Sequence, residues 1–540
     1  MASATALLAI IATPAVALLL RAAWVALSCY VLTPMRIRRA MARQGVHGPP
    51  PRPLIGNLRD VSALVARATA DDMPALTHDI VGRLMPHYVL WSRTYGKLFV
   101  YWYGSEPRLC LTDAAMIREF LSSKYAASGA TGKSWLQRQG TRHFIGRGLL
   151  MANGTHWSHQ RHVVAPAFMA DKLKGRVGHM VECTKQTVRA LREAAASPGG
   201  ARRREVDVAA YMTRLTGDII SRTEFDTSYE TGKRIFHLLE DLQHLTARSS
   251  RHLWIPGSQY FPSKYRREIG RLNAELEAVL TESIGRSREI ADEGRTTSAY
   301  GRGLLAMLLA EMERKKQDAG DGDAARKQQQ FSYDLQLVID ECKTFFFAGH
   351  DTSALLLTWA LMLLSTHPDW QDRARDEVAR VCGDAPPSYD DLSKLTVLHM
   401  IIHETLRLYP PATLLPRMVF EDIHLGGGGG GGRLHLPAGL SVWIPVLAIH
   451  HDEAIWGADA HEFRPERFAA GRRPAFLPFA AGPRNCVGQA YALVEAKLVL
   501  AMLLQSFRFA ISDDYRHAPV NVLTLRPKHG VPVHLRPLRP

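Results

Sequence analysis

A cysteine lies in a glycine-rich loop near the C-terminal end of the chain, in the sequence Phe479-Ala-Ala-Gly-Pro-Arg484-Asn-Cys486-Val-Gly488. Glycines permit a tight loop whose backbone N–H groups turn toward the sulfur, and an apolar helix is expected over residues 490–504. Amide hydrogen bonds and a helix N-terminus both favour thiolate over thiol. Such a thiolate is a ligand for haem iron, and Arg484 is placed to pair with a haem propionate. The alternative is an ordinary buried cysteine in a turn.

A threonine and an aspartate interrupt a long apolar helix, expected over residues 334–365, in the sequence Ala348-Gly-His-Asp351-Thr352-Ser353. A threonine inside a helix can hydrogen-bond back to a carbonyl, and a preceding glycine loosens the same turn. Together they predict a small groove in which O2 and a water fit. Ordinary helix polarity is the alternative. His350 is expected to lie on a helix face, because the sulfur already supplies the axial bond.

Two further motifs are weak by themselves. Glu404 and Arg407 are spaced i, i+3, so they can pair on one helix face, and Pro465-Glu-Arg467-Phe468 follows about sixty residues later. Trp157 and Arg161 are spaced i, i+4, so the indole N–H and the guanidinium can reach one anionic group together.

Taken in this order, the motifs resemble those of the cytochrome P450 family, and the resemblance covers nearly the whole chain from residue 48 onward. It implies a mainly α fold with a minor β part, in a single large haem domain that binds heme b. Cys486 is implied as the iron ligand. The residues implied to bind the cofactor are Cys486, Arg484, Trp157, Arg161, Arg417, Phe479 and Gly488.

The same resemblance implies roles for five other residues. Thr352 would donate a hydrogen bond on the oxygen side of the haem, and Asp351 would relay protons from solvent. Glu404, Arg407 and Arg467 would form a buried structural triad. The implied reaction inserts one atom of O2 into a small organic molecule, with electrons from NADPH delivered by NADPH–cytochrome P450 reductase. A haem-thiolate isomerase or dehydratase and a haem sensor are the alternatives, and the Asp351–Thr352 pair argues against both.

Several stretches, over residues 44–49, 78–88, 133–140 and 144–154, resemble one plant branch of the family, the cytokinin trans-hydroxylases. These enzymes hydroxylate the terminal methyl of the isopentenyl chain on N6-(isopentenyl)adenine nucleotides and give trans-zeatin forms. The alternative substrates are a gibberellin, a brassinosteroid, a fatty acid or a terpenoid.

Four basic side chains precede the Trp157 helix, in a segment that lines the access path in related enzymes: Lys133, Arg138, Arg142 and His143. Arginine suits phosphate because its planar fork can donate two hydrogen bonds at once. We expect one or two of these residues to bind the phosphate of a nucleotide substrate. A solvated loop or a propionate contact is the alternative.

The N-terminal segment is apolar over residues 6–20 and again over residues 22–32, long enough to cross a membrane. No Lys or Arg precedes it, whereas Arg36, Arg38, Arg39 and Arg43 follow it. This asymmetry predicts a single-pass anchor in the endoplasmic reticulum membrane, with the catalytic domain facing the cytosol. The expected organisation is an anchor at 1–33, a basic and proline-rich neck at 34–53 and a haem domain at 54–540.

The composition sets broader limits. Sixty-seven Lys and Arg against 52 Asp and Glu give the 540 residues a net charge of +15. The basic balance suits an acidic reductase, an anionic membrane or an anionic substrate, and no nucleic-acid fold signature accompanies it. The six cysteines lack any CxxC pair. Strands are expected near residues 98–103, 108–112 and 440–449, surface loops at 197–204 and 313–330, and a hairpin tip at the glycine run 426–432.

Overall fold

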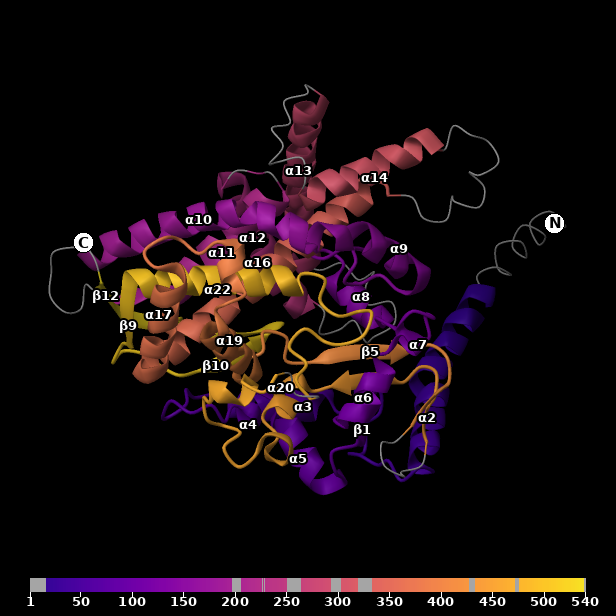
Figure 1. Ribbon diagram of the computed structural model, residues 1–540. Coiled ribbons are helices and arrows are strands. Elements are labelled where there is room, and N and C mark those ends of the chain that lie inside the picture. The colour runs from indigo at the N-terminus through magenta and orange to yellow at the C-terminus, as the bar shows by residue number, and fades with distance from the viewer. Residues whose placement is uncertain are drawn as a thin grey trace.

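The computed structural model describes residues 16–196, 205–225, 227, 229–249, 264–292, 303–318, 333–426, 433–471 and 475–538. Within these ranges helices predominate and the strands form four small sheets, as a mainly α fold with a minor β part requires. Figure 1 shows the long helices gathered in one part of the molecule, with the largest sheet and the N-terminal helix beside them.

The helices have the following bounds: η1 (Ser28–Leu32), α2 (Thr33–Ala42), α3 (Leu58–Ala68), α4 (Val81–Leu84), α5 (Pro86–Tyr95), α6 (Ala114–Phe120), α7 (Ser123–Ala126), α8 (Trp135–Thr141), α9 (Gly154–Val164), η2 (Ala165–Phe168), α10 (Ala170–Ala196), α11 (Val208–Glu224), α12 (Tyr229–Ser249), α13 (Lys264–Asp292), α14 (Leu304–Asp318), α16 (Leu335–Thr366), α17 (Pro368–Cys382), α18 (Tyr389–Leu392), α19 (Thr396–Leu408), α20 (Val446–His450), α21 (Glu453–Trp456), η6 (Pro465–Phe468) and α22 (Gln489–Ser506). The strands are β1 (Phe99–Tyr103), β2 (Glu106–Cys110), β3 (Thr131–Gly132), β4 (Glu205–Asp207), β5 (Leu415–Val419), β6 (Ile423–Leu425), β7 (Leu434–Leu436), β8 (Ser441–Ile444), β9 (Phe507–Ile511), β10 (Pro519–Val522), β11 (Thr524–Pro527) and β12 (Pro532–Pro537).

Helix α16 is the central element, and it packs against α11, α12, α17, α19 and α22. Asp334 begins the helix, because its carboxylate accepts a hydrogen bond from the Leu337 N–H at 2.6 Å. The second half of α16, from Ser353 to Ser365, is buried throughout. The helix expected over residues 334–365 is therefore confirmed, and it runs through the core instead of along the surface.

The largest sheet has five strands in the order β1-β2-β8-β5-β3. Strands β1 and β2 form an antiparallel hairpin, and β8 lies parallel to β2. The strand expected over residues 440–449 is only partly correct, because β8 ends at Ile444 and α20 follows. Pro445 has no N–H for a strand ladder, and its ring favours the start of a helix.

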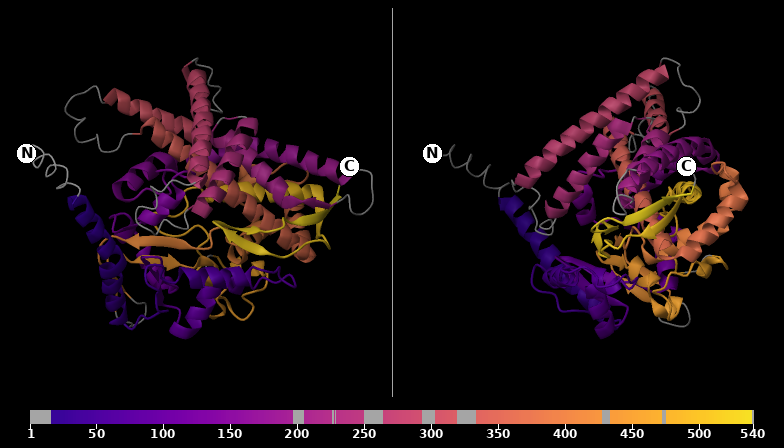
Figure 2. Two further views of the ribbon diagram at one scale, coloured as in Figure 1. Left: turned by 180° about the vertical axis from the view of Figure 1, so that it is seen from behind. Right: turned by 90° about the vertical axis from the view of Figure 1, so that its left-hand side faces the viewer.

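Two expected loops also differ. Helix α14 extends to Asp318, so the first part of the loop expected at 313–330 is helical. The rest of that loop from residue 319 to 330, the loop at 197–204, and most of the glycine run lie outside the described residues. Strands β6 and β7, which flank the glycine run, pair as an antiparallel ladder. Figure 2 shows the sheets from behind and from one side.

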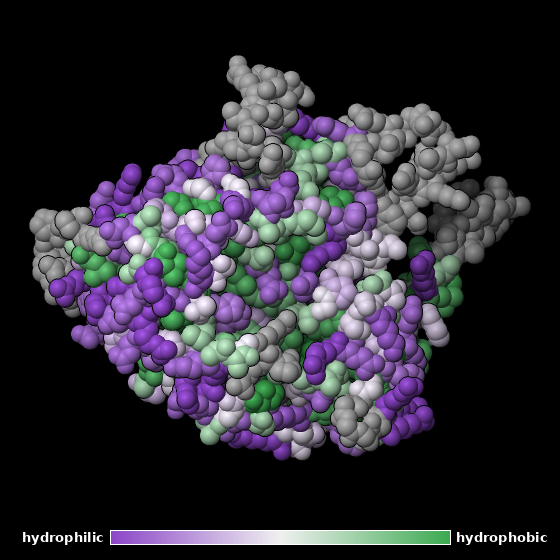
Figure 3. Space-filling view, viewed as in Figure 1, coloured by the Kyte–Doolittle hydropathy of each residue, from purple (hydrophilic) through white to green (hydrophobic). Residues whose placement is uncertain are grey.

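The N-terminal helix is continuous from Val16 to Ala42. It is long and apolar enough to cross a membrane, and its apolar stretch is not buried against the rest of the protein. Residues 34–42, expected in a neck, belong to this helix. Ile37 and Met41 are fully buried beside the sheet, and the Arg36 guanidinium donates to the Ala438 carbonyl at 2.6 Å. Only the proline-rich part after residue 45 is extended. The surface in Figure 3 mixes polar and apolar residues.

Candidate functional site

The cysteine loop is held closed by its own backbone. The Cys486 N–H donates to the Phe479 carbonyl at 2.9 Å, and the Asn485 N–H donates to the Gly482 carbonyl at 3.1 Å. Gly482 has φ of +71°, and a Cβ there would lie 1.8 Å from the Leu121 carbonyl oxygen. Only glycine fits this close approach. The loop ends at Gly488, which is the N-cap of α22.

The Cys486 side chain is accessible to solvent, although dense packing surrounds it. Burial raises the pKa of the Cys486 thiol, whereas the Gly488 N–H and the positive charge of Arg161 lower it. Burial has the larger effect, so the protein's own groups do not by themselves hold the sulfur as thiolate. A metal cation at the sulfur would supply the missing stabilisation, because metal binding displaces the thiol proton.

Three cationic side chains gather near this loop, and we call Lys133, Arg417 and Arg484 the cationic cluster; Lys133 and Arg417 are buried and Arg484 is partly buried. Burial lowers the pKa of Arg417 to about 10. The pKa of Arg484 is lowered to about 9 by burial and by the nearby charges of Arg417 and Arg161. The pKa of Lys133 is held well below its usual value by burial and by the charges of Arg417 and Arg484.

Among the described residues, no carboxylate pairs with any member of the cationic cluster, and Arg484 Nη1 is a buried donor without an acceptor. Uncompensated buried cations are unfavourable. A bound dianion would relieve this unfavourable arrangement, so the cluster fits the two propionates of haem. The sequence pointed to Arg417 and Arg484 for this role, whereas Lys133 was expected at a substrate phosphate.

Trp157 and Arg161 contact different groups. The Arg484 guanidinium lies over the Trp157 ring, 4.9 Å from its centroid, so the indole supports a member of the cationic cluster. Arg161 instead donates to the backbone and side-chain oxygens of Asn485, at 2.8 and 2.9 Å. The structure thus places Arg161 on the cysteine loop, where it fixes the residue before Cys486. Asn485 had no signal in the sequence beyond its place in the loop.

Thr352 on α16 makes the expected hydrogen bond back to a carbonyl of its own helix. The Thr352 hydroxyl donates to the Ala348 carbonyl at 2.6 Å, four residues earlier. Gly349 has a second role that the sequence did not indicate, since a Cβ there would lie 2.8 Å from Ile220 Cδ1, so glycine lets α11 approach α16 closely. The His350 imidazole lies on the helix face, 3.0 Å from the Thr213 carbonyl and stacked on Phe236.

Asp351 does not point freely into solvent. Its carboxylate pairs with Arg526 at 2.8 Å and accepts from the Thr524 hydroxyl at 2.7 Å, so β11 covers one side of it. Both Asp351 and Arg526 line a cavity of about 430 Å³ between α11, α12 and α16. The Asp351 carboxylate is therefore at the wall of this cavity, one residue before Thr352 in the sequence.

The Glu404–Arg407 pair is fully buried, and it is bidentate, with N–O distances of 2.7 and 2.8 Å. Arg407 also donates to the carbonyls of His450 and Ala460. Arg467 approaches Glu404 with a distance of 3.5 Å between Nε and Oε1. The structure thus brings the three residues together as one network, which ties α19 to η6 and to the loop before the cysteine.

One buried carboxylate near the site was missed. Glu495 lies on α22 beside Ser353, and burial raises its pKa to about 8, so it is largely protonated near neutral pH. Its signal in the sequence was a glutamate within a mainly apolar run, nine residues after Cys486. The four residues suggested as phosphate partners also separate: Arg138 and Arg142 line one cavity, Lys133 joins the cationic cluster, and His143 lies near Arg142 and Lys343.

Comparisons with known proteins agree with this geometry. The family profile described as Cytochrome P450 matches residues 78–531. Two proteins of Arabidopsis thaliana, each named "Cytokinin hydroxylase", are 52% and 53% identical to the chain, with 96% of this chain and 96% of each relative covered. "Cytochrome P450 734A4" of Oryza sativa subsp. japonica is 38% identical and covers 93% of this chain and 94% of its own. The chain therefore belongs to the cytochrome P450 family of haem-thiolate monooxygenases, and within it resembles the plant cytokinin hydroxylases.

Proposed function

We propose that this monooxygenase hydroxylates the terminal methyl of the isopentenyl side chain of N6-(isopentenyl)adenine nucleotides, giving trans-zeatin forms. The observation that carries the proposal is the identity of 52% and 53% to two proteins named "Cytokinin hydroxylase", over 96% of each chain. The 38% identity to the 734A4 relative, over a similar span, is much lower. The substrate class therefore follows the more similar relatives.

The residues around the cysteine loop fit heme b. Cys486 would ligate the iron, the cationic cluster and Trp157 would hold the propionates, and Phe479 and Gly488 would shape the loop around the sulfur. When bound, the thiolate-ligated haem supplies the activation of O2 that allows one oxygen atom to enter a carbon–hydrogen bond. The protein binds the cofactor, positions the methyl group and excludes competing reactions.

Two residues of α16, Thr352 and Asp351, would deliver the protons. The Thr352 hydroxyl donates its single hydrogen to the Ala348 carbonyl, and rotation of the hydroxyl away from that carbonyl would let it donate on the oxygen side of the haem instead. Asp351 would pass protons from the 430 Å³ cavity, and its bonds to Arg526 and Thr524 hold it at the wall of that cavity. A rotation of Arg526 away from Asp351 would free the carboxylate for this transfer.

Electrons would come from NADPH through NADPH–cytochrome P450 reductase, and the net charge of +15 favours an acidic partner. The exposed helix Val16–Ala42 would anchor the chain once in the endoplasmic reticulum membrane, with the haem domain in the cytosol. Because α2 packs on the sheet, we place the end of the anchor within this helix. The neck of 34–53 is then helical in its first half, and 54–540 form the haem domain.

The proposal is tested in two steps with the purified full-length chain and reductase. The carbon monoxide difference spectrum of the reduced protein should show the Soret band of a thiolate-ligated haem, and Cys486→Ala should lose it. Isopentenyladenine nucleotide, a gibberellin, a brassinosteroid, a fatty acid and a terpenoid are then offered with NADPH and O2. Hydroxylation of the nucleotide alone supports the proposal, and preferred turnover of another class contradicts it.

A further inference from the structure

A cavity of about 680 Å³ lies between α8, the loop that follows it, α9 and the start of α16. Its wall is strongly basic: Arg138, Arg142, Arg147, His156 and His159 line it, against a single acidic side chain, Asp334. A concave site lined by one sign of charge concentrates ligands of the opposite sign. The cavity therefore suits an anionic ligand.

The arginines of this wall are not equivalent. Arg147 forms ion pairs with Asp340 at 3.2 Å and with Asp334 at 3.5 Å, so the acidic residue of the cavity is already paired. Arg138 and Arg142 are exposed, and among the described residues neither guanidinium forms an ion pair. These two arginines are thus available to a ligand, and a phosphate can accept paired hydrogen bonds from each planar fork.

Two other side chains indicate a ligand with a flat, hydrogen-bonding ring. The Trp135 indole lines the cavity and is 43% exposed, and within the described part of the chain it has no aromatic partner. An exposed indole is a stacking surface for a base. Gln160, only 4% exposed, lines the same cavity, and its Oε1 is a buried acceptor to which no group of the described residues donates. An N–H or O–H of a ligand would satisfy that oxygen.

We propose that this cavity is the phosphate end of the substrate site, where Arg138 and Arg142 bind the phosphate of a purine nucleotide beside Trp135. The inference rests on the proposed function and adds the residues that select a nucleotide over a nucleoside or a free base.

The position of the cavity agrees with this role. Leu337 lines the cavity and lies eleven residues before Ala348 on α16, which corresponds to about 16 Å along the helix. Ala152 also lines the cavity, and its carbonyl accepts from Arg484 at 2.6 Å. The phosphate would thus lie next to the cationic cluster but outside it.

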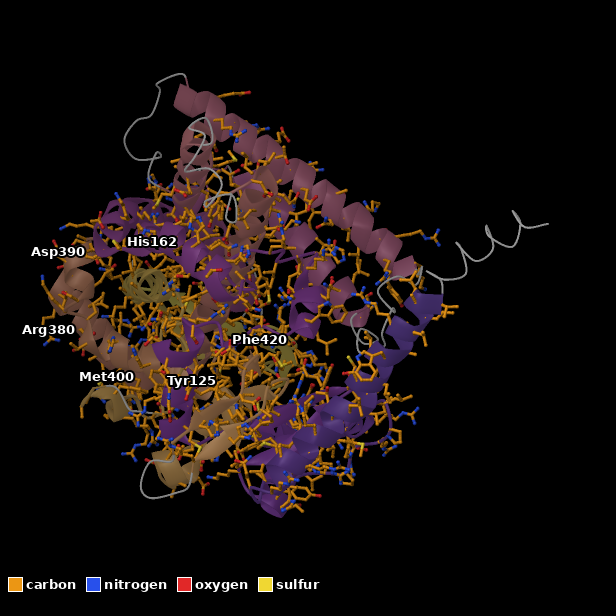
Figure 4. All side chains as sticks on the ribbon, turned by 90° about the vertical axis from the view of Figure 1, so that its right-hand side faces the viewer. Tyr125, His162, Arg380, Asp390, Met400 and Phe420 are labelled. Carbon is orange, nitrogen blue, oxygen red and sulfur yellow. The ribbon has the colours of Figure 1, made fainter. Side chains whose placement is uncertain are left out.

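The first experiment measures binding without turnover. Adenosine 5′-monophosphate and adenosine, which have no isopentenyl chain to oxidise, are titrated calorimetrically into the haem-loaded enzyme and into an Arg138→Gln/Arg142→Gln variant. The nucleotide should bind the variant roughly tenfold to a hundredfold more weakly, because two charge-assisted contacts are lost. Adenosine should bind both proteins alike. An Arg380→Gln variant is the control, because Arg380 (labelled in Figure 4) is an exposed arginine on α17 and does not line this cavity.

The second experiment measures KM for isopentenyladenine nucleotide and for the free base. In the double variant KM should rise for the nucleotide and stay unchanged for the base, with kcat little altered. Equal nucleotide affinity in both proteins, or no nucleotide binding by either, overturns the inference even if hydroxylation is normal. Failure of the unaltered enzyme to hydroxylate any isopentenyladenine compound contradicts the proposed function instead, whatever the titration gives.

Discussion

Thr352 and Thr358 make the same local contact on the same helix. Each hydroxyl donates to the carbonyl four residues earlier, at 2.6 and 2.7 Å. They differ in surroundings, since Thr358 is fully buried in the core, whereas Thr352 is only partly buried. The pair therefore separates the chemical role of a hydroxyl from its effect on the helix.

A Thr352→Ala variant should lose proton delivery while keeping the fold. Product formed per NADPH should fall by roughly 10²-fold, at the low end of the contribution of a positioned proton donor. Hydrogen peroxide should rise in compensation, and both are measured in one turnover assay. Thr358→Ala removes the same back-bond and should leave the ratio of product to peroxide unchanged. An unchanged ratio in Thr352→Ala would show that this hydroxyl does not manage protons.

Gly482→Ala should abolish the cofactor site. The added Cβ would collide with the Leu121 carbonyl oxygen at 1.8 Å, and neither group is a flexible side chain that could move aside. We expect almost no haem to be retained in the purified variant, measured by the ratio of Soret to protein absorbance. Gly383→Ala is the control, because Gly383 also has positive φ, of +58°, but nothing lies within 4 Å of its Cβ position. The Gly383→Ala variant should lose only roughly 1–3 kcal/mol of unfolding free energy, through backbone strain.

At this scale the sequence predicted local contacts well and long-range partners poorly. The cysteine loop and the Thr352 back-bond depend on neighbours within ten residues, so spacing suffices to predict them. The bonds of Arg161 to Asn485 join residues 324 positions apart, and the contact of Asp351 with Arg526 spans 175. No local pattern encodes such a contact, so these partners became visible only in the folded chain.

At the scale of elements, the Glu404–Arg407 pair holds α19 in register with the segment that precedes the cysteine loop. Removing one member of a buried ion pair leaves the other charged and unpaired, which costs about 3–5 kcal/mol. Glu404→Gln should therefore fail to retain haem and should unfold at a much lower temperature than the unaltered protein. Circular dichroism and Soret absorbance, followed on heating, measure both effects.

The control for this variant uses an exposed pair with the same spacing. Glu268 and Arg271 on α13 are also i, i+3 and lie 2.7 Å apart, but both side chains are solvent-exposed. Glu268→Gln should leave the unfolding temperature unchanged, because water replaces the lost contact. A normal unfolding temperature for Glu404→Gln would mean that the triad does not stabilise the scaffold.

Helix α2 illustrates where composition misled. Its arginines and nearby prolines placed it in a neck outside the haem domain, yet Ile37 and Met41 face the sheet with exposures of 0% and 1%. The periodicity of these two apolar residues, four apart, is a helical signal hidden among four basic residues. By contrast α16 and α22 are long and mainly apolar, so their existence and approximate bounds were predictable.

Two truncations test whether α2 belongs to the folded domain. A chain beginning at Thr33 keeps α2 and should release the protein from membranes without loss of stability. A chain beginning at Arg43 also loses Ile37 and Met41, and with them roughly 3–6 kcal/mol of apolar burial at most. Denaturant unfolding of the two truncated proteins should therefore differ in midpoint. Equal midpoints would show that α2 is only an extension of the anchor.

At the scale of the whole molecule, four buried histidines link folding to pH. Burial lowers the pKa of His78 and His450 to about 3, and that of His87 and His517 to about 4, from an ordinary value near 6.5. The effects of His78 and His517 are coupled, because both rings hydrogen-bond to the Tyr409 hydroxyl. Above pH 6.5 each is neutral in both the folded and the unfolded chain, and none of them affects stability.

Below pH 6.5 the unfolded chain binds protons that the folded chain excludes, so stability must fall as pH falls. Each such histidine contributes up to about 1.4 kcal/mol of destabilisation per pH unit, from pH 6.5 down toward its pKa in the folded chain. Urea midpoints at pH 8.5, 7.5 and 5.5 should be nearly equal for the first two and clearly lower for the third. His87 packs against the rings of Trp91 and Trp443, so His87→Phe should fill the site and reduce the loss at pH 5.5. His47→Gln, at an exposed position, should change nothing, and a pH-independent midpoint in the unaltered protein would contradict neutral burial of these histidines.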